Sequence, residues 1–503
     1  MMKDILQESD LDWALGWLAQ DKKHYIDGDW IAGAGADWSV KNPATGETLC
    51  RIALADKDQI EASAVAANRC HQSEAWSRKT ARKARADQLL AIARLIRENV
   101  TRLALLESLA NGKTYLEAVN DDIYTCAEIF EYYAGWTDKF YGEVSPVEDG
   151  FLNFTTKDPV GVCALIAPWN YPLYQASLKI APALAMGNSV VMKPSEYTPL
   201  ATLHLFELID RQMDLPKGLL NLVLCDGEAA NQLTISRNVH KVSFTGSTGV
   251  GRRIVQNSGA SNLKSVTLEL GGKSPCVFFD DTANLDAAIE RAFYVMFSQK
   301  GEKCSEPTRF LIQKGIYDYV LEKLVARAEA VTCGDPLLSS TQQGAQCNEA
   351  QFKRILNYIE IGKTEAELVA GGHADTSGEN GKGLFIRPTI FSNVPDTARI
   401  AQEEIFGPVL SCTPFATADE AVRIANGTSY GLAAGVYTGN VSLAHRIAER
   451  LDAGMVFVNR YGCYGLSAPF GGFKESGWGK EMAIHSLSSY TRSKSTWIYY
   501  GDA

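Results

Sequence analysis

The stretch "HKVSFTGSTGVGRRIVQNSG", residues 240–259, joins three signals in an order typical of α/β proteins. An apolar run predicts a buried strand, the turn FTGSTGVG at 244–251 follows it, and apolar positions three and four apart then predict a helix. Backbone N–H groups at a helix start attract phosphate, and Gly246, Gly249 and Gly251 would allow a phosphate to approach closely. The spacing is not GxGxxG, so a tight turn without a ligand stays an open alternative.

The alternation of strand and helix continues on both sides of this stretch. Strands that end in loops are predicted in VGVCALIAPWN (160–170), SVVMKPSEYTP (189–199), GLLNLVLCDG (218–227) and SVTLELGGKSP (265–275), and helices in SLKIAPALAMGN (177–188) and TLHLFELIDRQM (202–213). Residues 55–115 have helical periodicity, and a second α/β run begins at 271, with a helix capped by Asn284 that ends near Gly301. The chain is therefore predicted to be an α/β protein with doubly wound parallel sheets.

Two segments lack the helices that accompany the other strands. Residues 138–158 and the tail SLSSYTRSKSTWIYY (486–500) are rich in β-branched and aromatic residues. Exposed strands of this kind need covering, commonly by another subunit. We therefore expect these segments to take part in assembly.

The bulk composition excludes several classes of function. The 503 residues are 46% hydrophobic and 21% charged, which is typical of a folded globular protein with more than one domain. The net charge of −10 argues against a nucleic-acid or anionic-membrane surface, and no run approaches the ~18 apolar residues that span a bilayer. The start MMKDILQESD is charged and acidic, so we expect no secretory signal.

The 11 cysteines and seven histidines are scattered singly, without a CxxC pair. This pattern argues against a zinc site or a disulfide framework, so we expect no metal and a reducing cytosol.

Three short stretches carry side chains suited to chemistry. Cys304, in GEKCSEPTR (301–309), is predicted on a loop, where a thiolate would be accessible and the adjacent Lys303 could lower the pKa of its thiol. Glu269, in LELGG (268–272), follows an apolar strand, where burial would raise the pKa of its carboxyl and suit it to act as a base. Lys193 and Glu196, in VVMKPSE (190–196), end a strand at the edge where doubly wound sheets bind ligands. An acidic side chain there can bind a ribose diol and repel a 2′-phosphate, which favours NAD over NADP.

Each of these residues also has a plainer interpretation. The cysteine could be a surface thiol, the glutamate a solvated strand end, and the Lys–Glu pair an ordinary ion pair. A thiol hydrolase is a further alternative, but no histidine lies in a recognisable triad setting.

Seven motifs in one order identify a family that this chain resembles. They are PWNYP (168–172), KPSEYTP (193–199), FTGSTGVG (244–251), LELGGKSP (268–275), GEKC (301–304), EEIFGPV (403–409) and PFGGFKESGWGKE (469–481). Together, from about residue 25 to the C-terminus, they resemble the NAD(P)-dependent aldehyde dehydrogenase superfamily of the hydrolytic, non-acylating type.

The resemblance implies a role for each of four catalytic residues. Cys304 is the expected nucleophile, which forms a thiohemiacetal with the aldehyde and then a thioester. Asn170, together with the backbone N–H of Cys304, is the expected oxyanion donor, and Glu269 the base that activates water. Lys179 matches a lysine near the base that is sometimes assigned to a proton relay.

The resemblance also implies a set of contacts to NAD. Lys193 and Glu196 are expected at the adenosine ribose, Ser247 at the diphosphate, Glu404 at the nicotinamide ribose and Phe406 beside the nicotinamide. The remaining positions expected to line the cofactor are Ile166, Trp169, Gly227, Gly246 and Leu270.

The family fold predicts three domains. They are an NAD-binding domain (1–137 and 159–270), a catalytic domain (271–480) and a small β oligomerisation arm (138–158 and 481–503). The expected partners are a small-molecule aldehyde and further copies of the chain, as a homodimer or homotetramer, in the cytoplasm, with no nucleic acid and no membrane.

The chain departs from the family pattern around the nucleophile. Many relatives have Gln where this chain has Glu302 and a small or apolar residue where it has Lys303, and Glu306 and Pro307 are unusual. The wall of the substrate tunnel is therefore atypical.

The identity of the aldehyde stays open at this level. Enzymes for betaine aldehyde and amino-aldehydes commonly have a tryptophan-rich box, and here the corresponding positions hold Tyr171, Leu178, Tyr464 and Phe470. Lys303, with Arg460, could draw the carboxylate of a semialdehyde, or Lys303 could pair with Glu302 or Glu306 and touch no substrate. We expect a semialdehyde or an aromatic or aliphatic aldehyde. The alternatives are a betaine-aldehyde or amino-aldehyde dehydrogenase, a coenzyme A-acylating relative and a non-catalytic relative.

Overall fold

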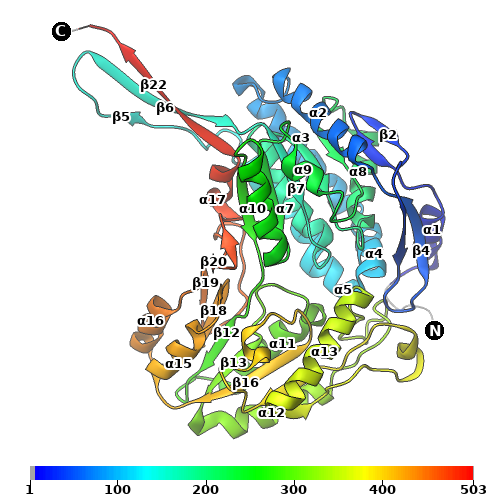
Figure 1. The fold of residues 1–503 in the computed structure, drawn as a ribbon, viewed down its shortest axis with the longest axis vertical. Coiled ribbons are helices and arrows are strands. Elements are labelled where there is room, and N and C mark those ends of the chain that lie inside the picture. The colour runs from blue at the N-terminus through cyan, green and yellow to red at the C-terminus, as the bar shows by residue number, and fades with distance from the viewer. Residues whose placement is uncertain (1–5, 502–503) are drawn as a thin grey trace.

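Two β-sheets, each with helices on both faces, lie one above the other, and a narrow β arm projects from the upper one (Figure 1). The computed structural model describes residues 6–501. The first five and the last two residues of the predicted domain ranges lie outside the described part. In that part, no helix is both long enough and apolar enough to cross a bilayer.

The upper body contains an eight-stranded sheet in the order β2-β1-β9-β8-β7-β10-β11-β21. Five central strands are parallel, and β1, β2 and β21 join them antiparallel at the edges. The strand order reverses between β7 and β10, which makes this the switch point where doubly wound sheets bind ligands. The strands are β1 (His24–Ile26), β2 (Asp29–Ile31), β7 (Val162–Ile166), β8 (Ser189–Lys193), β9 (Leu220–Leu222), β10 (Lys241–Thr245), β11 (Ser265–Glu269) and β21 (Gly477–Trp478).

Helices cover both faces of this sheet, as its parallel, fully buried strands require. One face packs against α3, α4, α6, α7 and α8, and the other against α2, α9 and α10. The helices are α1 (Glu8–Leu18), α2 (Lys57–Gln72), α3 (Arg82–Glu98), α4 (Val100–Asn111), α5 (Tyr115–Glu117), α6 (Tyr124–Ala134), α7 (Pro172–Ala185), α8 (Leu200–Gln212), α9 (Asn231–Ile235) and α10 (Thr248–Ala260). A π-helical turn (Ala118–Ile123) joins α5 to α6, and β3 (Asp37–Lys41) pairs with β4 (Thr48–Ala53) outside the main sheet.

The lower body contains a seven-stranded sheet in the order β14-β15-β16-β13-β12-β18-β19, parallel except for β14. The strands are β12 (Pro275–Phe278), β13 (Arg309–Gln313), β14 (Glu367–Ala370), β15 (Thr389–Ser392), β16 (Val409–Phe415), β18 (Ala433–Tyr437) and β19 (Met455–Val458). The helices are α11 (Leu285–Phe297), α12 (Tyr317–Glu329), α13 (Glu349–Glu365), α14 (Arg399–Gln402), α15 (Ala418–Asn426) and α16 (Val441–Arg450). A two-stranded ribbon of β17 (Tyr430–Gly431) and β20 (Phe473–Lys474) lies beside this body.

The prediction of two doubly wound sheets is confirmed, as is the helix capped by Asn284. The side chain of Asn284 accepts a hydrogen bond from the Ala287 N–H. The helix ends at Phe297, and a short helical turn continues to Gly301, so Cys304 lies on the loop beyond it as expected.

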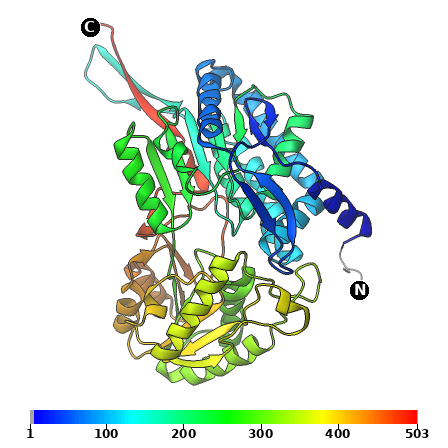
Figure 2. The ribbon, with the colours of Figure 1, turned by 45° about the vertical axis from the view of Figure 1, so that its right-hand side comes forward.

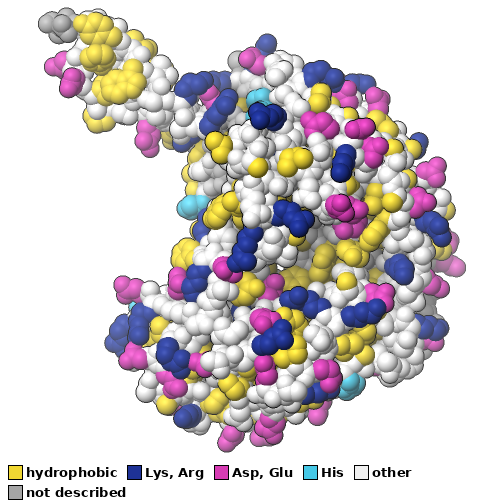
Figure 3. Space-filling view, in the orientation of Figure 1, with side chains coloured by type: hydrophobic (Ala, Val, Ile, Leu, Met, Phe, Trp, Pro, Cys, Tyr) yellow, Lys and Arg dark blue, Asp and Glu magenta, His cyan; other side chains and the backbone are white. Residues whose placement is uncertain are grey.

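The arm consists of β5 (Val144–Ser145), β6 (Phe151–Pro159) and β22 (Thr491–Tyr499). Strands β6 and β22 pair antiparallel along their whole length and project well beyond the helices in both ribbon views (Figures 1 and 2). Its outer end carries exposed aromatic and aliphatic side chains, visible as a yellow cluster in Figure 3: Phe151, Trp497, Ile498, Tyr499 and Tyr500.

The predicted boundary of the arm at residue 481 is wrong. Residues 483–489 form helix α17 (Ala483–Ser489), and Glu481, Met482 and Leu487 are buried in the upper body. The arm strand begins only at Thr491. The segment that composition marked as strand, 486–500, also begins too early, because its serine-rich start packs as a short helix.

Candidate active site

The predicted site residues of the upper body gather along one edge of its sheet. Four parallel strands, β7, β8, β10 and β11, end at the same edge, and each is followed by a predicted contact. Ile166 ends β7, Lys193 ends β8, Gly246 follows β10 and Glu269 ends β11. Loops of the lower body that enter the adjacent parallel strands β13 and β16 supply the rest, since Cys304 precedes β13 and Glu404 precedes β16.

The sulfur of Cys304 faces a cavity of about 440 Å³ between the two bodies. Cys304 and Cys333 are partly buried, eight of the other cysteines are buried and Cys463 is exposed. All 11 cysteines are free thiols. Cys304 is therefore set apart from the rest by its position in a cavity.

The expectation that Lys303 lowers the pKa of the Cys304 thiol is wrong. The Lys303 ammonium donates to the carbonyl of Val295 at 2.5 Å and to Ser298 Oγ at 2.7 Å. Burial raises the pKa of the Cys304 thiol well above its ordinary value, and the carboxylates of Glu269 and Glu404 raise it further. Burial and these carboxylates both disfavour the thiolate, and the Lys303 ammonium, which is bonded elsewhere, does not offset them.

Asn170 is held beside the nucleophile loop. Its side chain is buried, and Nδ2 donates a hydrogen bond to the backbone carbonyl of Glu302 at 2.8 Å. Because a primary amide carries two N–H hydrogens, the other remains for an oxygen in the cavity. This arrangement fits the oxyanion role implied by the sequence.

Glu269 is buried, with one carboxylate oxygen lacking a hydrogen-bond partner. Burial raises the pKa of Glu269 well above 4.5, and repulsion from Glu481 adds to the increase, while Lys179 and Lys480 oppose it. A carboxyl whose pKa is raised in this way can take up and give back a proton more readily near neutral pH.

Lys179 forms a buried ion pair with Glu481 that the sequence did not reveal, and its charge acts on Glu269. Its ammonium donates to Thr245 Oγ1 at 2.7 Å and to the carboxylate of Glu481. Glu481 is the last residue of the motif PFGGFKESGWGKE, so the signal was present, but its position beside Lys179 and Glu269 depends on the return of the chain to the upper body through β21.

The start of helix α10 fits the diphosphate of a dinucleotide. Ser247 is the N-cap and accepts from the Val250 N–H, so the first backbone donors of a 13-residue helix face the sheet edge. A Cβ added at Gly249 would meet nothing within 4 Å, which leaves open space in the first turn. At Gly246 a Cβ would stand 2.5 Å from the Phe244 ring, so only glycine fits between the strand and the helix.

The adenosine side of the same crevice also fits. Lys193 is buried and Glu196 partly exposed, and their charged ends pair at 2.8 Å. The predicted ion pair is therefore present, at the strand edge where a ribose would lie. A Cβ at Gly227 would meet nothing within 4 Å, and Ile166 and Leu270 are buried in the core cluster beneath this crevice.

The three residues expected near the nicotinamide, Glu404, Phe406 and Trp169, lie close together. Glu404 Oε1 accepts from the Gly272 N–H at 2.9 Å, and burial raises the pKa of its carboxyl. The rings of Trp169 and Phe406 meet edge to face, with centroids 5.3 Å apart. Phe406 has a positive φ of 62°, a strained conformation for a non-glycine residue that is common at functional sites. The residues present therefore fit a dinucleotide along the whole crevice.

The cavity in front of Cys304 brings together the predicted pocket residues Tyr171, Lys303, Tyr464 and Phe470. Tyr464 hydrogen-bonds to Ser305 Oγ at 2.7 Å, which fixes one wall. Leu178 and Arg460 are not among the residues that line this cavity, since Leu178 lies in the core and Arg460 is on the surface.

Further lining residues were not predicted. They come from α6, α7, α11 and the π-helical turn, and they include Asp121, Glu128, Tyr174, Arg291 and Tyr294. Their sequence signal is only helical spacing, which marks a helix face without saying whether a cavity or a core covers it.

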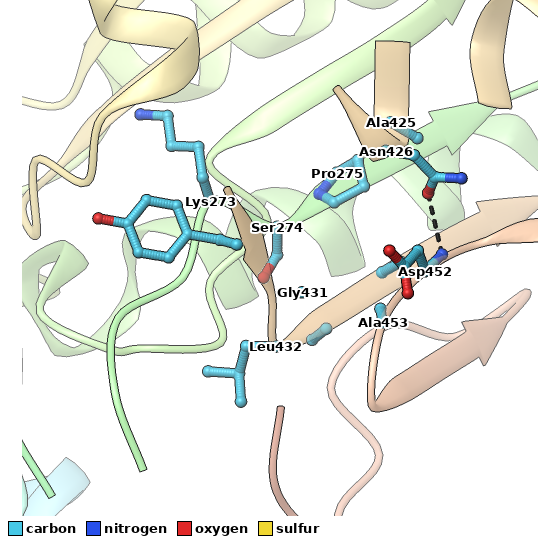
Figure 4. Close-up of a pocket in the computed structure, with 12 residues that line it drawn as sticks. Lys273, Ser274, Pro275, Ala425, Asn426, Gly431, Leu432, Asp452 and Ala453 are labelled. Carbon is cyan, nitrogen blue, oxygen red and sulfur yellow. Dashed lines mark hydrogen bonds between the residues drawn. The ribbon is translucent and has the colours of Figure 1, made fainter. Parts of the chain in front are cut away.

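A second depression, at the start of β12, is too small for a substrate (Figure 4). It has room for about 10 Å³, which is one water molecule at most. Asn426 Oδ1 accepts from the Asp452 N–H there, and the side chain of Lys273 points away from the other lining residues. Among the described residues, no cluster of three or more His, Cys, Asp or Glu side chains is placed to hold a metal ion.

Comparisons with known proteins agree with this geometry. The chain matches the model of the aldehyde dehydrogenase family over residues 30–496. It is 42% identical over 478 residues to the mitochondrial aldehyde dehydrogenase of Homo sapiens, with 94% of this chain and 91% of that protein covered.

Two solved structures have the same fold over nearly the whole chain. The P. syringae indole-3-acetaldehyde dehydrogenase AldA, in complex with NAD+ and IAA, has a TM-score of 0.94 at 39% identity, covering 98% of this chain and 100% of that one. The betaine aldehyde dehydrogenase of Staphylococcus aureus, in complex with NAD+, has a TM-score of 0.94 at 35% identity, covering 100% and 99%. The similarity therefore includes both bodies and the crevice between them.

Proposed function

The chain belongs to the aldehyde dehydrogenase family and uses NAD as its cofactor, and from this premise we propose that it oxidises an aldehyde to a carboxylic acid through two covalent states of Cys304. The first is a thiohemiacetal and the second a thioester. The observation that carries this proposal is the position of Cys304 in a cavity, with Asn170 held by the loop before it and Glu269 at the adjoining strand end.

The first step is attack of Cys304 Sγ on the aldehyde carbon, with the thiol proton passing to solvent water. Negative charge develops on the aldehyde oxygen, and the second N–H of Asn170 and the backbone N–H of Cys304 donate to it. The residues of the crevice would hold NAD beside Cys304, where it would supply the hydride acceptor that the conversion of the thiohemiacetal to the thioester requires. In the second step Glu269 removes a proton from water as its oxygen attacks the thioester carbon. Sγ then leaves and the carboxylic acid is released.

Buried charged groups near Glu269 influence its protonation. Glu481 and Lys179 form an ion pair whose two charges act in opposite directions on the pKa of Glu269, and Lys179 also donates to Thr245 Oγ1. We assign this group the return of Glu269 to its ionised state after each turnover.

The cofactor is held by backbone and side chains of the crevice. The α10 N-terminus with Ser247 would bind the diphosphate, Lys193 and Glu196 the adenosine ribose, and Glu404 the nicotinamide ribose. A carboxylate at Glu196 disfavours a 2′-phosphate, which supports the preference for NAD over NADP.

The charges around the cavity favour an amino-aldehyde with an aromatic or aliphatic body. Both cationic residues that line the cavity already have hydrogen-bond partners. Arg291 donates to the carbonyls of Tyr461 and Gly462, and Lys303 donates to the Val295 carbonyl and to Ser298 Oγ. Asp121 and Glu128 are exposed on the cavity wall, and in the part of the chain that the structure describes neither has an ion-pair partner. A carboxylated semialdehyde would meet these free carboxylates, whereas a protonated amine would pair with them.

An acylating enzyme that passes its thioester to coenzyme A is the second candidate. Such an enzyme has no need of a water-activating base, and the buried, high-pKa carboxyl of Glu269 supports hydrolysis instead. A non-catalytic relative is disfavoured because Cys304, Glu269 and Asn170 are all retained.

The exposed arm and the free cysteines bear on the oligomeric state and on the location of the protein. We propose a homodimer or homotetramer, because the arm carries exposed apolar side chains that a second subunit would cover. We propose a cytoplasmic location, which the 11 free cysteines support.

The test is an aldehyde panel in which reduced nicotinamide is followed by absorbance, with NAD and NADP compared side by side. We expect an ω-amino-aldehyde to have a higher kcat/KM than the carboxylated and uncharged aldehydes of equal length. The substitution Asp121→Asn should remove most of that preference, and Asp58→Asn, an exposed residue in the first turn of α2, is the matched control. Absence of cofactor reduction with every aldehyde would refute the proposed reaction, and equal rates with all three aldehydes would refute the proposed substrate class only.

A further inference from the structure

The loop before Cys304 has an unusual backbone. Gln299, Lys300 and Gly301 follow one another with φ values of 55°, 61° and 73°, all in the left-handed region. Two of the three are not glycine, so this conformation has to be stabilised by its surroundings. At Gly301 a Cβ would stand 2.2 Å from the backbone of Gly407, so the loop is also pressed against the loop that carries Glu404 and Phe406.

A closed ring of contacts links this loop to the oxyanion amide. The Lys300 ammonium pairs with Glu302 Oε2 at 3.0 Å and donates to Asn111 Oδ1 at 2.6 Å. Asn111 Nδ2 donates to the Trp169 carbonyl at 2.8 Å, and the next residue, Asn170, donates to the Glu302 carbonyl at 2.8 Å, which closes the ring.

Every side chain in the ring that carries charge or an amide is inaccessible to water. Lys300 and Glu302 are each 1% exposed, Asn111 is fully buried and Asn170 is 6% exposed. The Lys300 ammonium also donates to the Asn111 carbonyl at 3.0 Å, so it has two hydrogen bonds to Asn111 beside its ion pair with Glu302. The other oxygen of Glu302 accepts from the Cys347 N–H at 3.1 Å. A buried charge pair of this kind is costly to break from one side, because the remaining charge is left without a partner.

We propose that Lys300 and Glu302 are positioning residues, which fix the Asn170 amide and the Cys304 loop in the geometry of the oxyanion site. The inference rests on the proposed function, because it concerns the oxyanion formed at Cys304. It goes beyond the family pattern, in which many relatives have a neutral Gln at the position of Glu302. This chain performs the same task with an ion pair, and its geometry therefore depends on the charge of one carboxyl.

Because Glu302 can be protonated, the geometry of the Cys304 loop should depend on pH. The charged and titratable groups facing Glu302 are Lys300, Lys113, Glu306 and the Cys347 thiol. Burial raises the pKa of Glu302 to about 6, with Lys300 acting in the opposite sense. Below that pH the carboxyl becomes neutral, the pair with Lys300 is lost, and the carbonyl that orients Asn170 is released from its fixed position.

The experiment compares Glu302→Gln, Lys300→Gln and the double variant that places a neutral amide at both positions. Each single variant leaves one buried charge unpaired, so kcat should fall by about tenfold to a hundredfold, the range expected for a misplaced catalytic group, with KM changed much less. The double variant should recover most of kcat. In the burst that forms the thioester, a step that precedes water activation by Glu269, the double variant should also lack the acid limb near pH 6 that the wild type shows. The matched control is Glu349→Gln, which removes an exposed pair with Lys353 and should change neither quantity.

The alkylation rate of Cys304 by a small neutral reagent, measured without aldehyde or NAD, gives a second readout of loop geometry. It should change in the single variants and return in the double variant. If the single variants do not fold, the kcat and the alkylation rate of the double variant test the proposal. A folded double variant that keeps the acid limb of the wild type in the burst rate overturns the proposal, as does a Glu302→Gln variant with wild-type kcat and a wild-type pH profile of the burst. A wild-type protein that reduces no cofactor with any aldehyde would instead refute the proposed function, and the alkylation readout would still test the ring.

Discussion

The backbone of Gly272 lies directly against the backbone of Cys304: a Cβ added at Gly272 would stand 2.3 Å from the Cys304 carbonyl oxygen. Gly272 also donates its N–H to Glu404. This glycine therefore separates the cofactor carboxylate from the nucleophile with no room for a side chain. The substitution Gly272→Ala should displace the loop and lower kcat by about a hundredfold. Steady-state kinetics beside circular dichroism would test this, and an unchanged kcat would contradict the contact.

Replacing Cys304 by serine should abolish cofactor reduction while leaving the melting temperature within a few degrees of wild type. A serine hydroxyl is a far weaker nucleophile than a thiol near neutral pH, and the neighbouring carboxylates disfavour its ionisation further. The control is Cys463→Ser, since that thiol is exposed and should be dispensable. Undiminished activity in the Cys304 variant would place the reaction elsewhere.

The substitution Asn170→Ala should lower kcat by about a hundredfold to a thousandfold with little change in KM. An oxyanion donor acts on charge that develops only in the transition state, so its loss affects kcat most. The same enzyme preparation should bind NAD as tightly as wild type in a fluorescence titration. A large rise in KM with kcat unchanged would assign Asn170 to ground-state binding instead.

The substitution Glu269→Gln should stop turnover after the thioester forms. We expect one equivalent of reduced nicotinamide in a rapid burst and then almost none, with an acyl adduct on Cys304 in the intact mass spectrum. A variant with neither burst nor adduct would show that Glu269 acts before the thioester.

The raised pKa of Glu269 also has consequences for pH. Above pH 4.5 the Glu269 carboxyl keeps its proton in the folded chain and loses it in the unfolded chain. The contribution of Glu269 to the free energy of unfolding therefore falls as the pH rises toward its folded-state pKa. Thioester hydrolysis should increase over the same interval, since the base is then ionised. Thermal melts at several pH values, compared with Glu269→Gln, should show the wild type losing its relative stability as the pH increases. A parallel pH dependence in both proteins would contradict this assignment.

The arm should control the state of assembly. Trp497 and Tyr499 are more than half exposed near the end of β22, so Trp497→Lys together with Tyr499→Lys should weaken association without disturbing either core. Light scattering after size exclusion should show a smaller species than wild type. An unchanged mass would mean that another surface holds the subunits together.

Sequence periodicity predicted the two sheets, the helix after Asn284 and the strand ends that carry Lys193 and Glu269. These are signals of local pattern and burial, which the structure retains. The direction of the Lys303 side chain could not be predicted, because it depends on the three left-handed residues before it. The buried partner of Lys179 could not be predicted either. Glu481 reaches that position only because β21 returns to the upper sheet, and such a long-range pairing has no local signature.

The same ring of contacts sets a limit on protein engineering. Lys300 and Asn111 are 189 positions apart in the chain, yet they share the hydrogen bond that supports the nucleophile loop. A graft that transfers residues 299–306 to a homologous scaffold would leave that support behind. Exchange of catalytic segments between such enzymes should succeed only when the end of helix α4 travels with the donor loop.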